Sequence, residues 1–413
     1  MIKAIRGTRD LLPPSTGVWN YVESVARDVF RVFNYQEIRT PLLEETQLFV
    51  RSVGEDTDIV TKEMYTFVDR DETSLSLRPE ATASVIRAYI EHRLDQQPGI
   101  QKLYYLGPMF RRERPQKGRY RQFFQIGAEA IGSESPAVDA EVIEMVMTLL
   151  ASTGLEGHRL LVNSVGCSKC RPQYVEILRQ KLAEVAPRMC VDCQRRAVTN
   201  PLRVLDCKVE ADQPIIEALP SILDHLDEGC RTHFEAVRRY LDEREICYEV
   251  RPRLVRGLDY YTRTTFEVVH GSLGAQNSVL GGGRYDGLAE SLGSKVPAPG
   301  IGFSIGEDRL VLTLEQSRPD LARHRVDLFI AALDEPAFTR CAALARELRQ
   351  AGKVVELAPA GRLKRALEVA NKLGARYALI VGETEMAADL YTLKDMTTGE
   401  QTKVSRSQLV NLN

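Results

Sequence analysis

The residues best suited to chemistry in this chain are a cation beside two phenols and, further along, a run of glycines. Residues 256–263 read Arg-Gly-Leu-Asp-Tyr-Tyr-Thr-Arg, and residues 281–287 read Gly-Gly-Gly-Arg-Tyr-Asp-Gly. A guanidinium matches the planar oxygens of carboxylates and phosphates, a tyrosine offers a flat wall with one hydroxyl, and glycines let the backbone approach a ligand. The two segments therefore indicate a site for an anionic ligand. Each alone is also compatible with a glycine-rich turn beside a structural arginine.

A second polar group lies between residues 110 and 130. Six of the eleven residues from Arg111 to Arg121 are basic, and Pro115 and Gly118 mark a turn between two strands. Alternation along the second strand gives one face to the core residues Phe124, Ile126, Ala128 and Ala130. The other face, which we interpret as the floor of a pocket, carries Phe123, Gln125, Gly127 and Glu129. A solvated sheet face and a solvated basic turn are the simpler alternatives.

A third segment combines a strand with the start of a helix. In residues 300–306, Gly302, Ser304 and Gly306 alternate with three apolar residues, so one face packs and the other leaves room for a flat ligand. A helix then begins and carries Arg309 in its first turn, where the helix end and the guanidinium both favour an anion. A buried strand followed by an ordinary helix is the alternative.

Two further segments position these residues. Residues 35–45 predict a strand that ends in proline, and residues 77–82 predict a helix that opens at Pro79, a favoured first-turn residue. The helix before them is indicated by apolar residues at helical spacing: Val18, Val22, Val25, Val29 and Phe33.

Together these segments resemble the signature motifs of the histidyl-tRNA synthetases, a family of class II aminoacyl-tRNA synthetases. Residues 256–263 and 281–287 resemble the family's own motifs, whereas residues 35–45, 111–122 and 300–309 resemble class II motifs 1, 2 and 3. The resemblance covers essentially the whole chain in family order. It departs at Glu307 and Asp308, where an uncharged residue followed by glutamate is commoner, and at Phe124, where histidine is common. We expect little consequence from either departure.

The resemblance implies roles for individual residues. Histidine would be bound by Glu80, Ala81, Thr82, Arg111, Gln125, Glu129, Arg256, Tyr260 and Tyr261. ATP would be bound by Arg111, Glu113, Phe123, Arg256 and Arg309, and the catalytic residues would be Arg111, Arg256 and Arg309. The tRNA would be contacted by Arg114, Gln116, Lys117 and Arg119. The implied reaction activates L-histidine with ATP and Mg²⁺ to histidyl-adenylate and transfers it to the 3′ end of tRNA(His), without a protein general base.

The order of predicted elements indicates an α+β protein with three parts. Residues 1–320 resemble a class II catalytic domain with a mostly antiparallel sheet flanked by helices, and motif 1 implies a homodimer. A cysteine-rich, largely helical insertion interrupts this domain at residues 166–250. Residues 326–413 read as two successive βαβ units, with strands at 326–332, 354–357 and 377–381, and resemble an α/β anticodon-binding domain.

The insertion raises the question of a metal. Cys167 and Cys170 form one C-x-x-C pair and Cys190 and Cys193 another, separated by 19 residues, a spacing that fits one four-cysteine zinc site. Cys207 follows. The family resembled is not known for requiring zinc, so reduced, partly buried thiols are the alternative.

Composition limits the remaining choices. The chain has 413 residues, a formal net charge of −2 and eight cysteines, which favours a multidomain protein of a reducing compartment, and we expect the cytoplasm. No apolar run approaches the length of a membrane span. Two rival functions remain: a non-catalytic synthetase paralogue that regulates histidine biosynthesis, and a nucleic-acid-binding module without catalysis. The paralogue typically lacks the C-terminal α/β domain and parts of the active site, which this chain retains.

Overall fold

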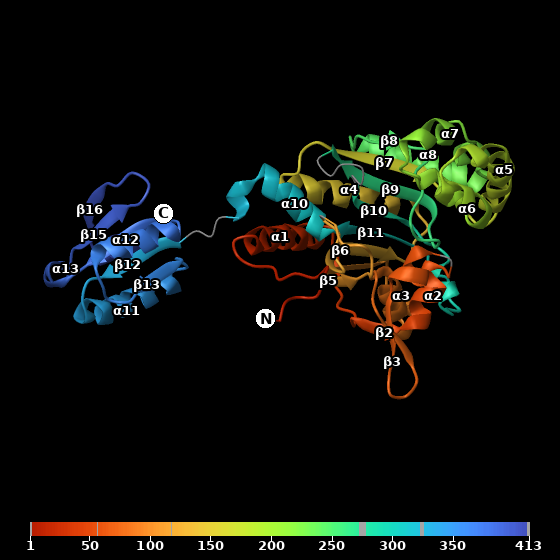
Figure 1. Cartoon of the computed structure of the whole chain (residues 1–413). Coiled ribbons are helices and arrows are strands. Elements are labelled where there is room, and N and C mark those ends of the chain that lie inside the picture. Colours follow the sequence, from red (N-terminus) through yellow and green to blue (C-terminus); the bar gives the residue numbers. More distant parts are fainter. Residues whose placement is uncertain (1, 56, 117, 272–277, 323–325, 411–413) are drawn as a thin grey trace. The chain divides into compact units, whose positions relative to one another are not determined.

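A computed structural model describes residues 2–55, 57–116, 118–271, 278–322 and 326–410 (Figure 1). The chain divides into two compact units, which we describe separately. The larger comprises Met1–Leu12 and Val18–Arg318, and the smaller comprises Pro13–Gly17 and Pro319–Asn413.

The larger unit is built on an eight-stranded sheet with the order β1-β5-β6-β11-β10-β9-β7-β8. Every pairing is antiparallel except the two at the edges, β1 with β5 and β7 with β8. The mostly antiparallel α+β architecture is thus confirmed. The strands are β1 (Gln36–Glu37), β5 (Gln101–Phe110), β6 (Gln122–Ile131), β7 (His158–Ser164), β8 (Glu249–Val250), β9 (Thr262–His270), β10 (Ser278–Arg284) and β11 (Gly300–Gly306).

Four helices pack on one face of this sheet (Figure 1): α1 (Thr16–Val32), α4 (Pro136–Thr153), α8 (Glu228–Glu243) and α10 (Glu307–Ser317). Helix α1 buries an apolar stripe, and its Phe30 stacks on Tyr104 of β5 with ring centroids 4.5 Å apart. Helix α4 starts at the Ser135 cap and ends at Gly154, whose positive φ of 78° suits glycine. The opposite face of the sheet is left for the site.

A small sheet and two helices border that opposite face. The sheet has the order β2-β4-β3, formed by β2 (Leu43–Glu45), β3 (Tyr65–Val68) and β4 (Ser74–Leu77). The helices are α2 (Thr46–Val53) and α3 (Thr82–Glu91), and the short α9 (Leu288–Ser291) packs on both. The predicted helix start at Pro79 is wrong, because α3 begins at Thr82. The carboxylate of Glu80 accepts the first free N–H groups of that helix, from Thr82 at 2.7 Å and Ala83 at 3.0 Å.

The segment after β7 is largely helical and has its own apolar cluster, from Cys170 to Cys230. It contains α5 (Cys170–Val185), α6 (Val191–Thr199), α7 (Gln213–Glu217) and the 3₁₀ turns η3 (Ala186–Arg188), η4 (Pro201–Asp206), η5 (Glu210–Asp212) and η6 (Ile222–His225). The chain then returns to the main sheet, because α8 packs on β7 and β9 and β8 pairs with β7.

The smaller unit is a five-stranded sheet with the order β13-β12-β14-β15-β16 and helices on both faces. Its strands are β12 (Val326–Ala332), β13 (Val355–Ala358), β14 (Ala375–Val381), β15 (Tyr391–Asp395) and β16 (Gln401–Val404). Its helices are α11 (Glu335–Gln350), α12 (Leu363–Lys372), α13 (Glu383–Ala388) and α14 (Arg406–Val410). The first three strands are parallel, which confirms the two predicted βαβ units, and β15 and β16 add an antiparallel edge that the sequence pattern missed.

Candidate active site

Glu129 of β6 lies fully buried at the centre of the open face of the large sheet. Its carboxyl accepts hydrogen bonds from the Thr82 hydroxyl at 2.8 Å and from the Tyr285 hydroxyl at 2.6 Å. Burial raises the pKa of Glu129 to about 8, although both hydroxyls act to lower it. Gly302 on the neighbouring strand has no room for a side chain, since a Cβ there would overlap this carboxylate.

Four tyrosines surround this carboxyl: Tyr105, Tyr260, Tyr261 and Tyr285. The rings of Tyr260 and Tyr261 have centroids 4.8 Å apart, and Tyr285 meets Tyr260 edge-on at 6.0 Å. Burial raises the pKa of all four phenols, and the nearby Glu129 raises it further, so they remain neutral hydrogen-bonding groups. We call Glu80, Thr82, Glu129 and these four tyrosines the carboxyl pocket.

Glu80 is the second buried carboxyl of this pocket. It is 4% exposed, and burial raises its pKa although the N–H groups at the start of α3 act to lower it. Ala81 and Thr82 follow it in the chain and are also buried. Two acidic groups with polar partners can bind a ligand that carries more than one N–H donor.

An arginine-rich region adjoins the carboxyl pocket. Arg256 forms an ion pair with Glu267 of β9, and a Cβ at Gly281 would overlap the Arg256 guanidinium. The glycine run therefore makes room for other protein groups, since a Cβ at Gly283 would likewise overlap the Tyr261 ring. Burial lowers the pKa of Arg309, whereas the nearby Glu113 and Glu267 raise it, and its Nη1 donates to the carbonyl of Ser278 at 2.7 Å.

Arg111 links the two regions. Its guanidinium lies over the ring of Phe123, 5.2 Å from the centroid, and its Nε donates to the carbonyl of Pro79 at 3.0 Å, next to Glu80. Glu113 forms an ion pair with Arg119 at 3.0 Å. We call Arg111, Arg256 and Arg309, with Glu113 and Glu267, the arginine cluster. The cluster offers cationic groups, and the adjacent Phe123 offers an aromatic ring, to a phosphorylated, planar ligand.

The predicted alternation along β6 is confirmed. Gln125 donates to the Ser304 hydroxyl at 3.3 Å on the site face, and a Cβ at Gly127 would overlap the Tyr105 ring on that same face. Phe124 points to the core, where its ring meets Trp19 edge-on at 5.2 Å. The other departure from the family pattern also has a structural use, because Asp308 pairs with Arg9 at 2.7 Å and accepts the Phe124 N–H at 2.8 Å.

The residues predicted to contact tRNA lie on the loop between β5 and β6. Arg114 and Gln116 are exposed, Arg119 is half-buried, and a backbone bridge joins Gln116 to Arg119. Lys117 lies outside the described residues.

Sequence reasoning missed two tyrosines of the pocket. Tyr285 could have been predicted, because it lies in the glycine-rich segment. Tyr105 could not, because only the pairing of β5 with β6 places this strand residue beside Glu129. The arginine of the same segment, Arg284, has a structural role. It is fully buried and pairs with Asp139 of α4 at 2.5 Å, and His233 of α8 lies 2.8 Å from the same carboxylate.

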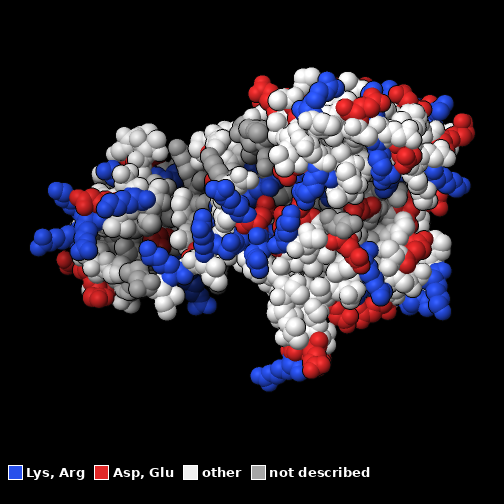
Figure 2. Space-filling model, turned by 45° about the vertical axis from the view of Figure 1, so that its right-hand side comes forward, with Lys and Arg blue, Asp and Glu red and all other residues white. Residues whose placement is uncertain are grey.

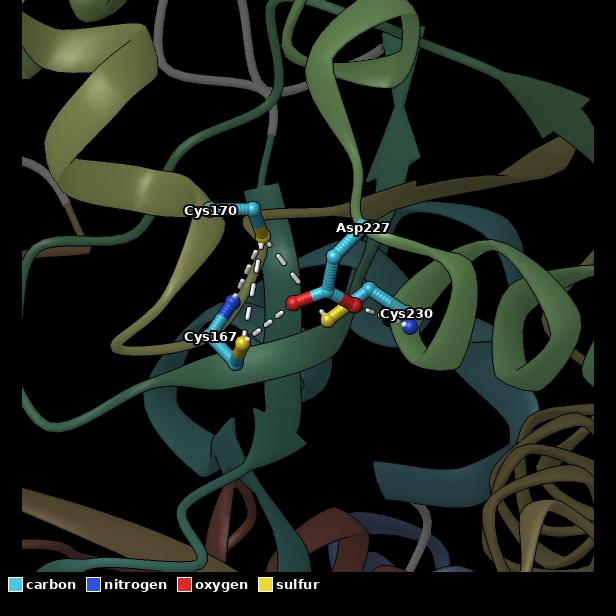
Figure 3. Close-up of side chains that lie close together, drawn as sticks. All are labelled: Cys167, Cys170, Asp227 and Cys230. Atoms are coloured by element: carbon cyan, nitrogen blue, oxygen red, sulfur yellow. Dashed lines mark hydrogen bonds between the residues drawn. The ribbon is translucent and has the colours of Figure 1, made fainter.

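The single four-cysteine site predicted for Cys167, Cys170, Cys190 and Cys193 is wrong. Each C-x-x-C pair belongs to a different cluster of potential metal ligands. The first thiol cluster contains Cys167, Cys170, Asp227 and Cys230 (Figure 3), and the second contains Cys190, Cys193, Cys207 and Asp212. The local pairing was predictable. The first cluster is completed by residues about 60 positions further along the chain, and the second by Cys207 and Asp212, which follow Cys193 within 20 residues.

Neither the surface charge nor the hydropathy of the helices gives further information about the ligand of the site. Basic and acidic side chains are interspersed over much of the face drawn in Figure 2. Among the described residues, no helix is long and apolar enough to cross a membrane.

The chain is similar to known proteins in its family match, its sequence and its structure. Residues 7–310 match the family model described as histidyl-tRNA synthetase, and residues 327–412 match the one described as anticodon binding domain. The chain is 71% identical to a protein named histidine–tRNA ligase from Solibacter usitatus, over 99% of this chain and 98% of that one. It is 58% identical to one of the same name from Koribacter versatilis, over 99% and 95%.

A solved structure is similar along its whole length. The crystal structure of apo histidyl-tRNA synthetase from S. aureus matches with a TM-score of 0.81 and 40% sequence identity. The match covers 100% of this chain and 99% of that chain.

Proposed function

Because the chain belongs to the histidyl-tRNA synthetase family, we propose that it is a histidine–tRNA ligase, a class II aminoacyl-tRNA synthetase. Full-length similarity to proteins of that name favours it over the non-catalytic paralogue that regulates histidine biosynthesis. The observation that carries the proposal is the position of Glu129, a buried carboxyl walled by tyrosines beside the arginine cluster. Such a pocket can bind an imidazole next to a nucleotide.

The carboxyl pocket would bind the substrate side chain and ammonium. Glu129 accepts a hydrogen bond from one imidazole nitrogen, and Tyr261 meets the other through its hydroxyl. Glu80 and Thr82 bind the α-ammonium, for which a buried carboxyl at a helix start is a suitable acceptor. Ala81 and Tyr260 line the space between these groups.

The arginine cluster would bind ATP and the substrate carboxylate. Gln125 and Arg111 orient that carboxylate, and the Oε1 atom of Gln125 has no hydrogen-bond partner among the described residues. Phe123 stacks on adenine, with Glu113 at the edge of the base. Arg309 binds the γ-phosphate. Glu267, a carboxylate beside Arg256, is the kind of oxygen ligand that Mg²⁺ would take together with ATP phosphates.

The first step would be attack of a histidine carboxylate oxygen on the α-phosphorus of ATP. The bond to the bridging oxygen breaks, pyrophosphate leaves and histidyl-adenylate remains. Such transfers depend mainly on positioning and on electrostatic stabilisation. Arg256, Arg111 and Arg309 would stabilise the charge on the phosphates, with Arg256 acting on the α-phosphate as that charge builds. Bound Mg²⁺ would supply further positive charge to the phosphates.

The second step would be attack of the terminal ribose hydroxyl of tRNA(His) on the adenylate carbonyl, which releases AMP. The loop residues Arg114, Gln116, Lys117 and Arg119 would contact the tRNA near its 3′ end. We assign residues 1–320 to catalysis, with an insertion at 166–250, and residues 326–413 to anticodon binding. We also propose a cytoplasmic homodimer.

Histidine-dependent exchange of pyrophosphate into ATP tests the first step. Wild-type protein should catalyse the exchange with L-histidine and with none of the other standard amino acids. Glu129→Gln should lose most histidine-dependent exchange, since a site built to hydrogen-bond a substrate group discriminates strongly when that partner is altered. The matched control Glu290→Gln changes an exposed glutamate and should behave like wild type. Absence of exchange in the wild-type protein would favour the regulatory paralogue.

A further inference from the structure

The two thiol clusters are the largest group of chemically reactive side chains that the proposed reaction does not use. Each contains three thiols and one carboxylate, and in each the four potential ligand atoms lie within 4.8 Å of one another. In Figure 3 the four side chains of the first cluster point toward a common centre from two separate segments of chain, residues 167–170 and 227–230.

The spacing of these atoms matches the edges of a tetrahedron around one ion. Zn–S bonds of about 2.3 Å give sulfur–sulfur edges of about 3.8 Å, and Zn–O bonds of about 2.1 Å give sulfur–oxygen edges of about 3.6 Å. In the first cluster the Sγ of Cys170 lies 3.9 Å from that of Cys167 and 3.8 Å from that of Cys230. The Cys167 thiol donates to Oδ2 of Asp227 at 3.0 Å, an edge that would lengthen when an ion replaces the proton. In the second, the Sγ of Cys207 lies 3.9 Å from that of Cys190 and 3.4 Å from Oδ2 of Asp212.

Backbone donors are arranged to stabilise anionic ligands in both clusters. In the first, the N–H of Cys167 donates to the Cys170 sulfur at 3.2 Å, and the N–H of Lys169 donates to the Cys167 sulfur at 3.4 Å. In the second, the N–H of Val209 donates to the Cys207 sulfur at 3.4 Å. The clusters also lie at the starts of helices α5, α8 and α6, where partial positive charge favours thiolates.

Other occupants of these clusters fit less well. A disulfide needs sulfur atoms about 2.05 Å apart, and all eight cysteines are free thiols. An iron–sulfur cluster would place its own iron and sulfide atoms at the centre and force the cysteine sulfurs further apart. Thiolate ligands in tetrahedral array favour zinc over the harder cations, which prefer oxygen.

We propose that each thiol cluster binds one structural Zn²⁺ ion, so that the chain holds two. The first ion would join the start of α5 to the start of α8, and the second would join the start of α6 to the η4–η5 region. Most of the ligands belong to the apolar cluster of the inserted segment, which is small and has little sheet structure to support it. Two ions there would stabilise a fold with a small core.

The first ion would also help to position a tyrosine of the neighbouring active site. Arg171, next to Cys170, donates to the carbonyls of Tyr261, Val165 and Gly166. The positive charge of this half-buried arginine would partly offset the net negative charge of a zinc ion bound by three thiolates and a carboxylate. The zinc site thus fixes the segment from which Tyr261 enters the carboxyl pocket.

The test is the metal content of the full chain, measured by elemental analysis. The protein is purified with a thiol reductant and without chelators, dialysed against buffer that contains zinc, and then dialysed against zinc-free buffer to remove unbound metal. Wild-type protein should retain two zinc ions per chain. Cys230→Ser and Cys207→Ser should each lose one ion, and the double variant should lose both. The matched control Cys341→Ser changes a buried cysteine of the smaller unit and should retain two.

X-ray absorption keeps the proposal testable if a variant fails to fold. Zinc in the wild-type protein should have three sulfur neighbours at about 2.3 Å and one lighter neighbour at about 2.1 Å. Protein without zinc after this loading, one ion per chain, or a shell of four sulfurs would overturn the proposal. Disulfide bonds within either cluster, found by mass spectrometry of peptides from protein purified in parallel without a reductant, would overturn it as well.

Discussion

The affinity for histidine should depend on pH through the buried carboxyl of Glu129. Its pKa of about 8 means that the carboxyl is mostly protonated in the free site at neutral pH, whereas the imidazole of free histidine, with a pKa of about 6.5, is mostly neutral. A complex that shares one proton between these two groups avoids an uncompensated charge in the pocket. A complex with no proton would bury an unpaired anion, and one with two protons would bury an unpaired cation.

The magnitude follows from proton counting. Above about pH 8 the free site has lost its proton, so binding must take one up, and the Kd should rise about tenfold per pH unit, or about 1.4 kcal/mol. Below about pH 6.5 binding must release a proton, and the Kd should rise again. The affinity should therefore be greatest between these values. The Tyr285 hydroxyl acts to lower the pKa of Glu129, so Tyr285→Phe should move the alkaline decline to higher pH.

Calorimetric titration of histidine into the protein without ATP, from pH 6 to 9 in buffers of different ionisation enthalpy, measures both affinity and proton uptake. The α-ammonium of histidine also loses its proton in alkaline solution, so Glu129→Gln is needed to isolate the carboxyl. The difference in proton uptake between wild type and this variant should approach one proton at the alkaline end. Identical pH profiles for the two proteins, or a wild-type affinity that rises from pH 7 to 9, would refute the reasoning.

Three further predictions concern other parts of the molecule. Arg256→Ala should raise the activation barrier to adenylate formation, measured in a single turnover, by about 3 kcal/mol. Histidine affinity should change little, because the charge that Arg256 stabilises develops in the transition state. An unchanged rate of adenylate formation would remove Arg256 from the mechanism. Deletion of residues 326–413 should leave pyrophosphate exchange measurable and sharply reduce tRNA charging, provided that the truncated protein is shown to be folded and dimeric; undiminished charging would mean that these residues do not recognise tRNA. Glu307 is fully buried, neither of its oxygens has a hydrogen-bond partner among the described residues, and burial raises its pKa to about 9. A raised carboxyl pKa stabilises the fold at low pH, and this contribution is lost as pH rises from about 4.5 toward 9, by about 1.4 kcal/mol per unit. Glu307→Gln should therefore flatten the pH dependence of the free energy of unfolding measured in urea, and an unaltered slope would contradict the assignment.

Local periodicity explains which features could be predicted from sequence. Alternation along β6 is a property of neighbouring residues, so the faces of Gln125 and Glu129 followed from the sequence. The α11 and α12 patterns likewise identified the βαβ order of the smaller unit. The hydrogen bond between Tyr285 and Glu129 joins residues 156 positions apart, and no local pattern specifies it.

The cysteines show the limit of spacing arguments. Each C-x-x-C pair was identified correctly as a local unit, because the spacing places both thiols at the start of a helix. Which pairs share a centre depends on tertiary structure, and Asp227 and Cys230 complete the first cluster from 60 residues away. The start of α3 was misplaced for a related reason, because the Glu80 carboxylate caps the helix from within the predicted first turn.

The most direct measurement of the central claim is the charging of tRNA with labelled histidine by the purified full-length chain. With ATP and Mg²⁺, the protein should form histidyl-tRNA on tRNA(His) and should not charge a non-cognate tRNA of equal length. A Glu290→Gln control should charge tRNA(His) as wild type does, whereas Glu129→Gln should charge poorly at the same histidine concentration. A folded wild-type protein that forms no histidyl-tRNA under these conditions would contradict the account.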